Sequence, residues 1–251
     1  MVEGREVGKR ADKEEVVLDN ICIIADTNSS RYQDLQNELA CLTRFVISPS
    51  KIRYLYKYYE SNITDNHYYS FWTWPEERIS VTGWLEGNII LNKRLLSLCL
   101  NHLCCLTVVG QNIKNNWSLI CEDDFYIPNK DTFTEDFLSV ISGCPDDADI
   151  IWISSGKKPL DCTYRNVCGY DSQTELTIVN DRFMHVQKSR YADCFLIRSN
   201  AARFLQEQLI SSKIGLPIDW EFNYILQTHP EIKSYWLTPA IVRQNPAYFT
   251  V

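Results

Sequence analysis

Three adjacent carboxylates, Glu122, Asp123 and Asp124, are the clearest chemical feature of the sequence. They directly follow the apolar segment 118–121, which has the length and composition of a buried strand. Ligands of open α/β sheets bind beyond the carboxyl ends of strands, and adjacent carboxylates repel each other unless a cation or solvent screens them. Hard oxygen ligands suit Mg²⁺ or Mn²⁺, so the triplet predicts a cation that holds a nucleotide diphosphate. A solvated acidic turn is the alternative.

The alternation of side chains along a strand divides the triplet. Glu122 and Asp124 are expected on one side, as the metal ligands, and Asp123 on the other, toward the nucleotide.

Further candidates lie at predicted strand and helix ends. Asp26 and Arg31 flank the turn between the first strand and the first helix. A helix N-terminus favours anions, so Arg31 is expected to contact a phosphate; an ordinary surface arginine is the alternative. His102 lies on an apolar helix, where a core histidine with one hydrogen bond is the alternative to a role near a ligand. His185, before a strand, is a weaker candidate metal ligand.

Asp219 and Glu221 lie near the start of another predicted helix, on either side of Trp220. Carboxylates there are also explained by the helix dipole, which stabilises them by up to about 1 kcal/mol. The two side chains project about 200° apart around the helix axis, so one of them at most can face a cleft.

Strands that alternate with helices must position these side chains. This order predicts an α/β fold with a mainly parallel sheet. We expect strands at 20–25, 44–48, 118–121, 150–153, 193–198 and 234–237, and helices at 30–42, 88–109, 133–141, 199–209 and 219–227. Ser30 with Gln33 reads as a capping box, Ser199 as a helix cap, and 162–184 as a β-rich or loop excursion. No glycine-rich dinucleotide fingerprint or Walker loop is present.

Composition narrows the class of protein. The 251 residues are 45% hydrophobic and 23% charged, as in soluble globular proteins. We expect a charged flexible leader at 1–18, without a signal peptide, and one domain at 19–251.

The net charge of −7 argues against nucleic-acid binding. The apolar stretch 95–110 reads as a buried helix and not a membrane span. Ten cysteines without a CxxC pair indicate a reducing compartment, so a cytoplasmic location is expected.

Five segments in order resemble glycosyltransferase family 25, which includes lipopolysaccharide glycosyltransferases and collagen galactosyltransferases. Segment 119–124 is similar to its LEDD-type motif, and Ser30-Arg31 to an Asp-Arg near its N-terminus. Helix 96–109 with Asn101-His102 resembles a helix that carries a Ser-His pair, with Asn101 in place of Ser. Segments 192–209 and 216–220 resemble its alanine-rich strand–helix and Pro-x-Asp-Trp, and 236–244 its Pro-rich tail ending in Gln. Residues 157–184 have no counterpart.

The resemblance implies a GT-A fold and transfer of a sugar from a nucleotide sugar, most simply a UDP-sugar, to a hydroxyl of a glycan or glycoprotein. It implies that Asp26 lies near the base and ribose and His102 near the donor. It also favours Asp219 as the catalytic base of an inverting transfer, with Glu221 as second choice, because Pro-x-Asp-Trp falls on Asp219. A bacterial or large-virus source fits best.

Two other functions stay open. A catalytically silent module of the same fold would bind a sugar nucleotide or a glycan, and the intact acidic triplet speaks against it. A nucleotidyltransferase also uses paired carboxylates and Mg²⁺, but it needs a glycine-rich basic loop that the sequence lacks. The sequence does not indicate the oligomeric state.

Overall fold

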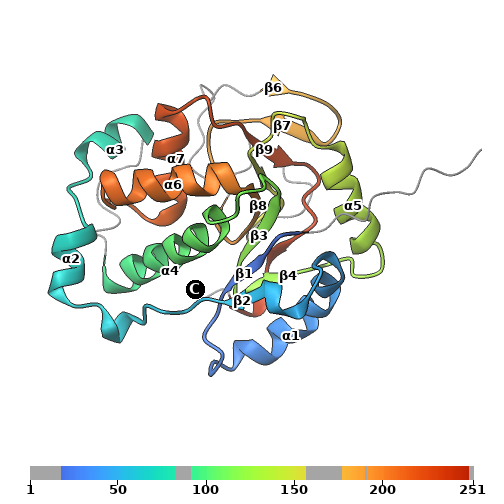
Figure 1. The fold of residues 1–251 in the computed structure, drawn as a ribbon, viewed down its shortest axis with the longest axis horizontal. Helices are drawn as coiled ribbons and strands as arrows, with labels where there is room; N and C mark the ends of the chain where they lie inside the picture. The colour runs from blue at the N-terminus through green and yellow to red at the C-terminus, as the bar shows by residue number, and fades with distance from the viewer. Residues whose placement is uncertain (1–17, 83–91, 157–176, 190, 249–251) are drawn as a thin grey trace, which may run out of the picture.

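A computed structural model describes residues 18–82, 92–156, 177–189 and 191–248 as helices packed on both faces of a central sheet (Figure 1). The predicted leader lies outside the described residues except for Leu18, which bridges to Val46. Segment 157–184 is described from Thr177 onward, where it forms two short strands. The expected α/β class, with a mainly parallel sheet flanked by helices, is confirmed.

The sheet has eight described strands, and β7 and β8 run against the direction of the other six. Both β8 neighbours, β3 and β5, pair with it antiparallel. In spatial order the strands are β2 (Ile52–Tyr54), β1 (Ile21–Ile24), β3 (Trp117–Glu122), β8 (Cys194–Arg198), β5 (Ile150–Trp152), β9 (Ser234–Leu237), β7 (Phe183–His185) and β6 (Thr177–Ile178).

A two-stranded ribbon follows the acidic triplet. Strand β4 (Phe125–Tyr126) pairs antiparallel with β10 (Arg243–Gln244), and Asn245 N–H donates to the carbonyl of Asp124 at 2.7 Å. The end of the chain therefore holds the backbone of the triplet.

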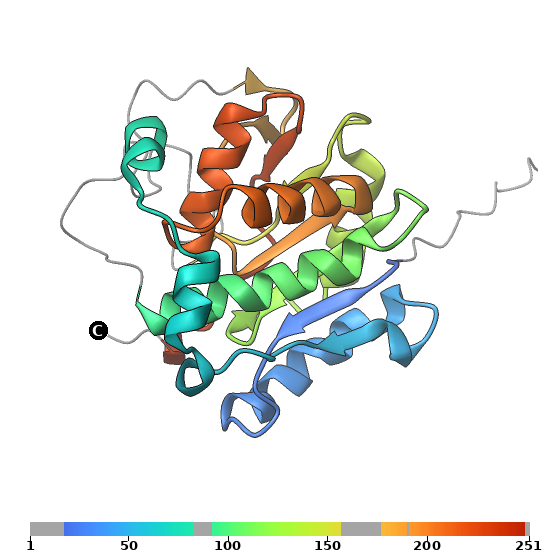
Figure 2. The ribbon, with the colours of Figure 1, turned by 60° about the vertical axis from the view of Figure 1, so that its left-hand side comes forward.

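The core has two layers, one on each face of the sheet, and each is covered by its own helices. Helices α4 (Lys93–Gly110), α6 (Ser199–Ser211) and α7 (Ile218–Thr228) cover one face of the sheet, and α1 (Arg31–Leu42) and α5 (Phe133–Gly143) cover the other (Figures 1 and 2). The strand side chains alternate accordingly: Ile24 and Ile120 pack toward α4, whereas Ile23 and Cys121 pack toward α1 and α5. Short helices α2 (Asp65–Phe71) and α3 (Glu76–Thr82) lie beside α4 and α7, and 3₁₀ turns occupy Thr43–Phe45, Pro49–Lys51, Glu60–Asn62 and Pro246–Tyr248.

Helix α4 is the central helix of the site face. It begins after Asn92, whose side chain accepts a hydrogen bond from Leu95 N–H at 3.0 Å. Among the described residues it is the helix long and apolar enough to cross a membrane, and 61% of it is buried within the fold. That burial is what a core helix shows. The expected helix over 88–109 is confirmed from Lys93 on, while 83–91 lie outside the described residues.

Three local predictions were wrong. The expected strand at 44–48 does not form: Thr43–Phe45 is a 3₁₀ turn, with Phe45 packed on Phe137 at a centroid separation of 4.4 Å, and Val46 makes an isolated bridge to Leu18. The strand follows at Ile52–Tyr54. Ser30 makes no side-chain capping bond; its backbone is already helical, with φ −61° and ψ −25°, and Ser29 Oγ accepts from Arg31 N–H. The cap position before α6 is Arg198, which leaves Ser199 as its first helical residue.

Candidate functional site

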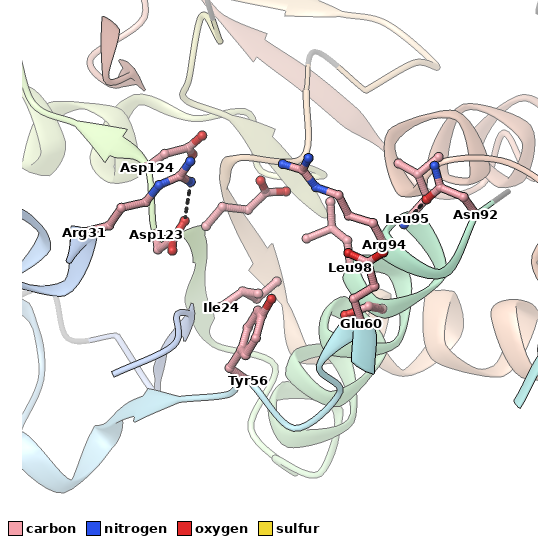
Figure 3. A pocket seen from close by; sticks show the side chains of 12 residues that line it. Ile24, Arg31, Tyr56, Glu60, Asn92, Arg94, Leu95, Leu98, Asp123 and Asp124 are labelled. Carbon is pink, nitrogen blue, oxygen red and sulfur yellow. Dashed lines mark hydrogen bonds and ion pairs between the residues drawn. The ribbon is translucent and has the colours of Figure 1, made fainter. Parts of the chain in front are cut away.

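A cavity of about 640 Å³ opens at the carboxyl ends of β1 and β3, beside the N-termini of α1 and α4 (Figure 3). All three members of the acidic triplet line it. Its other lining residues are Ile24, Arg31, Tyr56, Glu60, Asn92, Arg94, Leu95, Ser97 and Leu98. The volume is typical of sites that enclose a cofactor-sized ligand.

The triplet does not alternate as expected. Strand β3 ends at Glu122, and Asp123-Asp124 form a turn that leads into β4. The alternation of side chains along a strand therefore applies only as far as Glu122, and all three acidic residues line the same cavity. Each has different surroundings: Glu122 Oε1 contacts His102 Nε2 at 3.0 Å, and Asp123 Oδ1 accepts from Arg31 Nη1 at 3.3 Å. Asp124 Oδ1 is buried and has no hydrogen-bond partner in the described part of the chain.

Burial dominates the electrostatics of the triplet. It raises the pKa of Glu122 to about 8, with the charges of Asp123 and Asp219 adding to the effect. Burial, Glu122 and Asp123 raise the pKa of Asp124 to about 7, and Arg31 opposes both shifts. The site thus holds more carboxylate than its neighbouring cations neutralise.

His102 is a fully buried positioning residue. It does not line the cavity; it stacks on Phe195 at a centroid separation of 6.3 Å. Burial lowers its pKa to about 3, so the imidazole is neutral near pH 7 and its contact with Glu122 is a hydrogen bond between groups that are not oppositely charged. His102 can orient Glu122, while direct contact with a donor is not available to it.

Two arginines face each other across the cavity (Figure 3). Arg31, from the start of α1, is engaged: it pairs with Asp123 and lies over the Tyr248 ring at 4.6 Å from its centroid. Arg94, in the first turn of α4, is exposed and makes no ion pair with any residue the structure describes. Arg94 is not among the site residues predicted from the sequence, because an arginine in the first turn of a helix usually lies in solvent.

The Asp26 side chain hydrogen-bonds within its own turn and does not line the cavity. Its Oδ1 accepts from Asn28 N–H at 2.9 Å and from the Tyr59 hydroxyl at 3.4 Å. Tyr59 in turn packs edge-on against Tyr56, which lines the cavity, at a centroid separation of 4.8 Å. Asp26 therefore reaches the site through two tyrosines. Tyr56 belongs to the aromatic stretch 51–84, whose sequence predicts either packing beneath loops or one wall of a substrate cleft, and it lines the cavity.

Glu221, the second choice for a reacting carboxylate, lies in a buried ion pair. Its side chain is fully buried and pairs with Arg78, Nε to Oε2, at 2.9 Å. Its other oxygen accepts from the N–H groups of Gly215 at 2.5 Å and Leu216 at 2.8 Å. Both oxygens are thus occupied in tying α3 and the 212–216 turn to α7, so Glu221 is structural.

Asp219 sits at the first turn of α7, on the face of the sheet that α4 covers. Its Oδ1 accepts from Trp220 N–H at 3.1 Å, and burial raises its pKa to about 6. Its charge raises the pKa of Glu122 and acts on His102, which places it near the acidic end of β3, although it does not line the 640 Å³ cavity. His185 lies on β7 against Tyr235 and is not a lining residue either.

The residues present fit a hard divalent cation. Burial of the unpaired Asp124 Oδ1 costs free energy, and the raised pKa values of Glu122 and Asp124 show that their ionised forms are disfavoured. A bound cation would offset both effects. Among the described residues, no three His, Cys, Asp or Glu side chains already surround one point. Mg²⁺ commonly takes one or two carboxylates and completes its coordination with water and substrate phosphates, so two suffice.

Comparison with known proteins leaves the family open. No protein-family model and no curated protein sequence matches the chain. Among solved structures it is similar to the crystal structure of mouse xyloside xylosyltransferase 1 in its apo form, with 10% sequence identity and a TM-score of 0.40. That alignment covers 86% of this chain and 84% of the mouse chain. The resemblance to glycosyltransferase family 25 thus stays at the level of the motifs.

Proposed function

We propose that the protein is a divalent-cation-dependent glycosyltransferase of GT-A type, which transfers a sugar from a nucleotide sugar to a hydroxyl of a glycan or glycoprotein. One observation carries the proposal: incompletely neutralised carboxylates at a strand end share a 640 Å³ cavity with an unpaired arginine. A nucleotide diphosphate bound with a cation satisfies both, because the cation meets the acids and the phosphates meet the arginine. UDP-sugars are the first donors to test.

The acidic end of β3 forms one wall of the donor site. Asp124 and Glu122 would hold Mn²⁺ or Mg²⁺, which stabilises the negative charge of the departing diphosphate when bound. His102 holds Glu122 in position with a neutral imidazole. Asp123 pairs with Arg31 and is proposed to lie on the side of the nucleotide.

The N-terminus of α4 forms the opposite wall. Arg94 is free to pair with phosphate oxygens, and its place in the first turn of an 18-residue helix adds the favourable end of the helix dipole. Tyr56 and the turn of Asp26 form the side proposed for the base and ribose. Arg31 is a proposed donor contact through the edge of its guanidinium that Asp123 does not occupy.

Asp219 is the proposed catalytic base of an inverting transfer. Its raised pKa of about 6 leaves it mostly ionised at neutral pH yet a stronger base than an ordinary carboxylate. Glu221 is excluded by its buried pair, and the triplet is engaged on the donor side.

A donor screen tests the proposal. The protein is incubated with a panel of nucleotide sugars and Mn²⁺, and released nucleoside diphosphate is measured, with Asp124→Asn as the matched control. We expect release with at least one donor from the wild type and none from the variant. Equal release from both, or from an EDTA-treated sample, would refute the metal-dependent transfer.

A binding module without turnover is the second candidate. Saturable binding of a nucleotide sugar without release of diphosphate, at equal strength with and without Mn²⁺, would identify it.

A further inference from the structure

A row of four residues crosses the sheet at its acidic edge. The register pairs Ile24 of β1 with Glu122 of β3, and the antiparallel pairing of Cys121 with Cys194 brings Glu122 opposite Asp193. Glu122 N–H donates to the carbonyl of Asp193 at 2.8 Å, as this register requires. Ser154 follows β5, and its hydroxyl hydrogen-bonds Asp193 Oδ2.

The row faces the helices α4 and α7. Two residues before Glu122 on β3 is Ile120, and two after Asp193 on β8 is Phe195; both pack in the core cluster on the α4 side. Because strand side chains alternate, Glu122 and Asp193 point to that same side from directly opposite positions. Like charges placed opposite each other across two strands are destabilising unless something neutralises them.

Asp193 has no cation among the described residues to neutralise it. Its side chain is 1% exposed, and its Oδ1 is buried without a hydrogen-bond partner, as is Asp124 Oδ1. Burial raises its pKa well above the ordinary value, and the charges of Glu122 and Asp124 add to the shift. Burying a carboxyl oxygen without a hydrogen-bond partner costs free energy, and here a serine also fixes the orientation of the group. That cost is offset if the oxygen binds a ligand.

We propose that Asp193 Oδ1 is a further ligand of the divalent cation, shared with Asp124, and that Ser154 is the positioning residue that aims it. The inference rests on the proposed cation-dependent function and deepens it. The cation would then join β8 to the end of β3, so that its site is built from two strands and not from the triplet alone. Asp193 would be the third carboxylate beside Glu122 and Asp124, which the cation would draw together on binding, and diphosphate and water oxygens would complete its coordination.

Manganese binding provides a test that is independent of turnover. Mn²⁺ affinity is measured by electron paramagnetic resonance of free Mn²⁺, in the presence of saturating UDP, for the wild type, Asp193→Asn and Ser154→Ala. Asp149→Asn is the matched control, because Asp149 is a partly buried carboxylate at the opposite end of neighbouring β5, bonded to Lys233 N–H at 3.0 Å.

We expect Asp193→Asn to weaken Mn²⁺ binding at least about tenfold and Ser154→Ala to weaken it less, on the scale for groups that support a metal site. UDP binding without metal and the control variant should keep wild-type values. Because Asn is nearly isosteric with Asp and its amide oxygen can keep the hydrogen bond from Ser154, the unfolding temperature of the variant without metal should stay close to that of the wild type.

Two results distinguish a failure of this inference from a failure of the proposed function. Wild-type Mn²⁺ affinity in folded Asp193→Asn, together with its loss in Asp124→Asn, would refute the role of Asp193 alone. No Mn²⁺ binding by the wild type with any nucleoside diphosphate would refute the cation-dependent function itself, and the role of Asp193 with it. If Asp193→Asn fails to fold, an unchanged affinity in Ser154→Ala counts against the proposal.

Discussion

Replacing Glu221 with Gln separates a structural carboxylate from a reacting one two residues away. The side chains of Glu221 and Arg78 are 0% and 5% exposed, so the pair is out of water. The amide of Gln has one acceptor oxygen, whereas Glu221 uses two: one for Arg78 Nε and one for the N–H groups of Gly215 and Leu216. Either orientation of the amide therefore sets a donor against a donor.

The expected loss of stability follows from these contacts. Removing one partner of a buried ion pair costs roughly 3–5 kcal/mol. Arg78 keeps three bonds, to the carbonyls of Ser212 at 2.8 Å and Lys213 at 2.7 Å and to the Ser212 hydroxyl at 3.1 Å. We therefore expect a loss near the lower end of that range, about 3 kcal/mol. For a chain of this size each kcal/mol lowers the unfolding temperature by roughly 2–4 °C, so we expect a fall of about 6–12 °C.

Thermal unfolding followed by circular dichroism measures this fall, and Asp219→Asn is the control on the same helix turn. The Asp219 side chain accepts a hydrogen bond from Trp220 N–H that an Asn oxygen can keep, so the unfolding temperature of Asp219→Asn should change little. At temperatures where Glu221→Gln is folded, it should retain sugar transfer. A wild-type unfolding temperature combined with lost transfer in Glu221→Gln would refute the reasoning and return Glu221 to the reaction.

The other predictions concern the reaction and its ligands. Asp124→Asn should abolish release of nucleoside diphosphate while circular dichroism and unfolding temperature stay near wild type, and EDTA should do the same reversibly; persistence of full turnover in either case argues against a cation. Arg94→Ala should weaken UDP binding by about tenfold or more in titration calorimetry, since a charged hydrogen bond contributes roughly 1.5–3 kcal/mol. Arg31→Ala should weaken it too, by less than Arg94→Ala, because Arg31 already pairs with Asp123; the reverse order would show that Arg31 is the main phosphate contact. Asp219→Asn should keep UDP affinity and lower kcat by on the order of 10²-fold, the usual scale for a general base; near-normal kcat, or a product of retained configuration, would refute its role.

Features that depend on short segments were predictable. An apolar run of four residues followed by three acids specifies a buried strand with carboxylates at its end, because both signals lie within about seven residues. The structure has the strand at Trp117–Glu122 and the triplet beside a cavity. Strands at Ile150–Trp152 and Ser234–Leu237, and the helices that follow Thr132 and Pro217, came from equally local patterns.

The direction of β8 was not predictable in this way. A strand buried on both faces has the same apolar composition whichever way it runs. Its antiparallel place between β3 and β5 is decided by the path of the chain through the fold, and the alternating order of strands and helices does not encode it.

The tertiary structure alone decided which acids could act. Asp193 and Glu122 are far apart in the sequence, and strand pairing sets them opposite each other. Arg94 shares a cavity with the triplet because α4 crosses the face of the sheet and begins at its acidic edge (Figure 3). Asp219 and Glu221 look equivalent in the sequence, since both are acids near the start of a helix. In the fold Asp219 lies near Glu122, whereas Glu221 is buried in an ion pair with Arg78. Local sequence determines the type of a side chain and its element; its charge partners and burial depend on chain segments that only folding brings together.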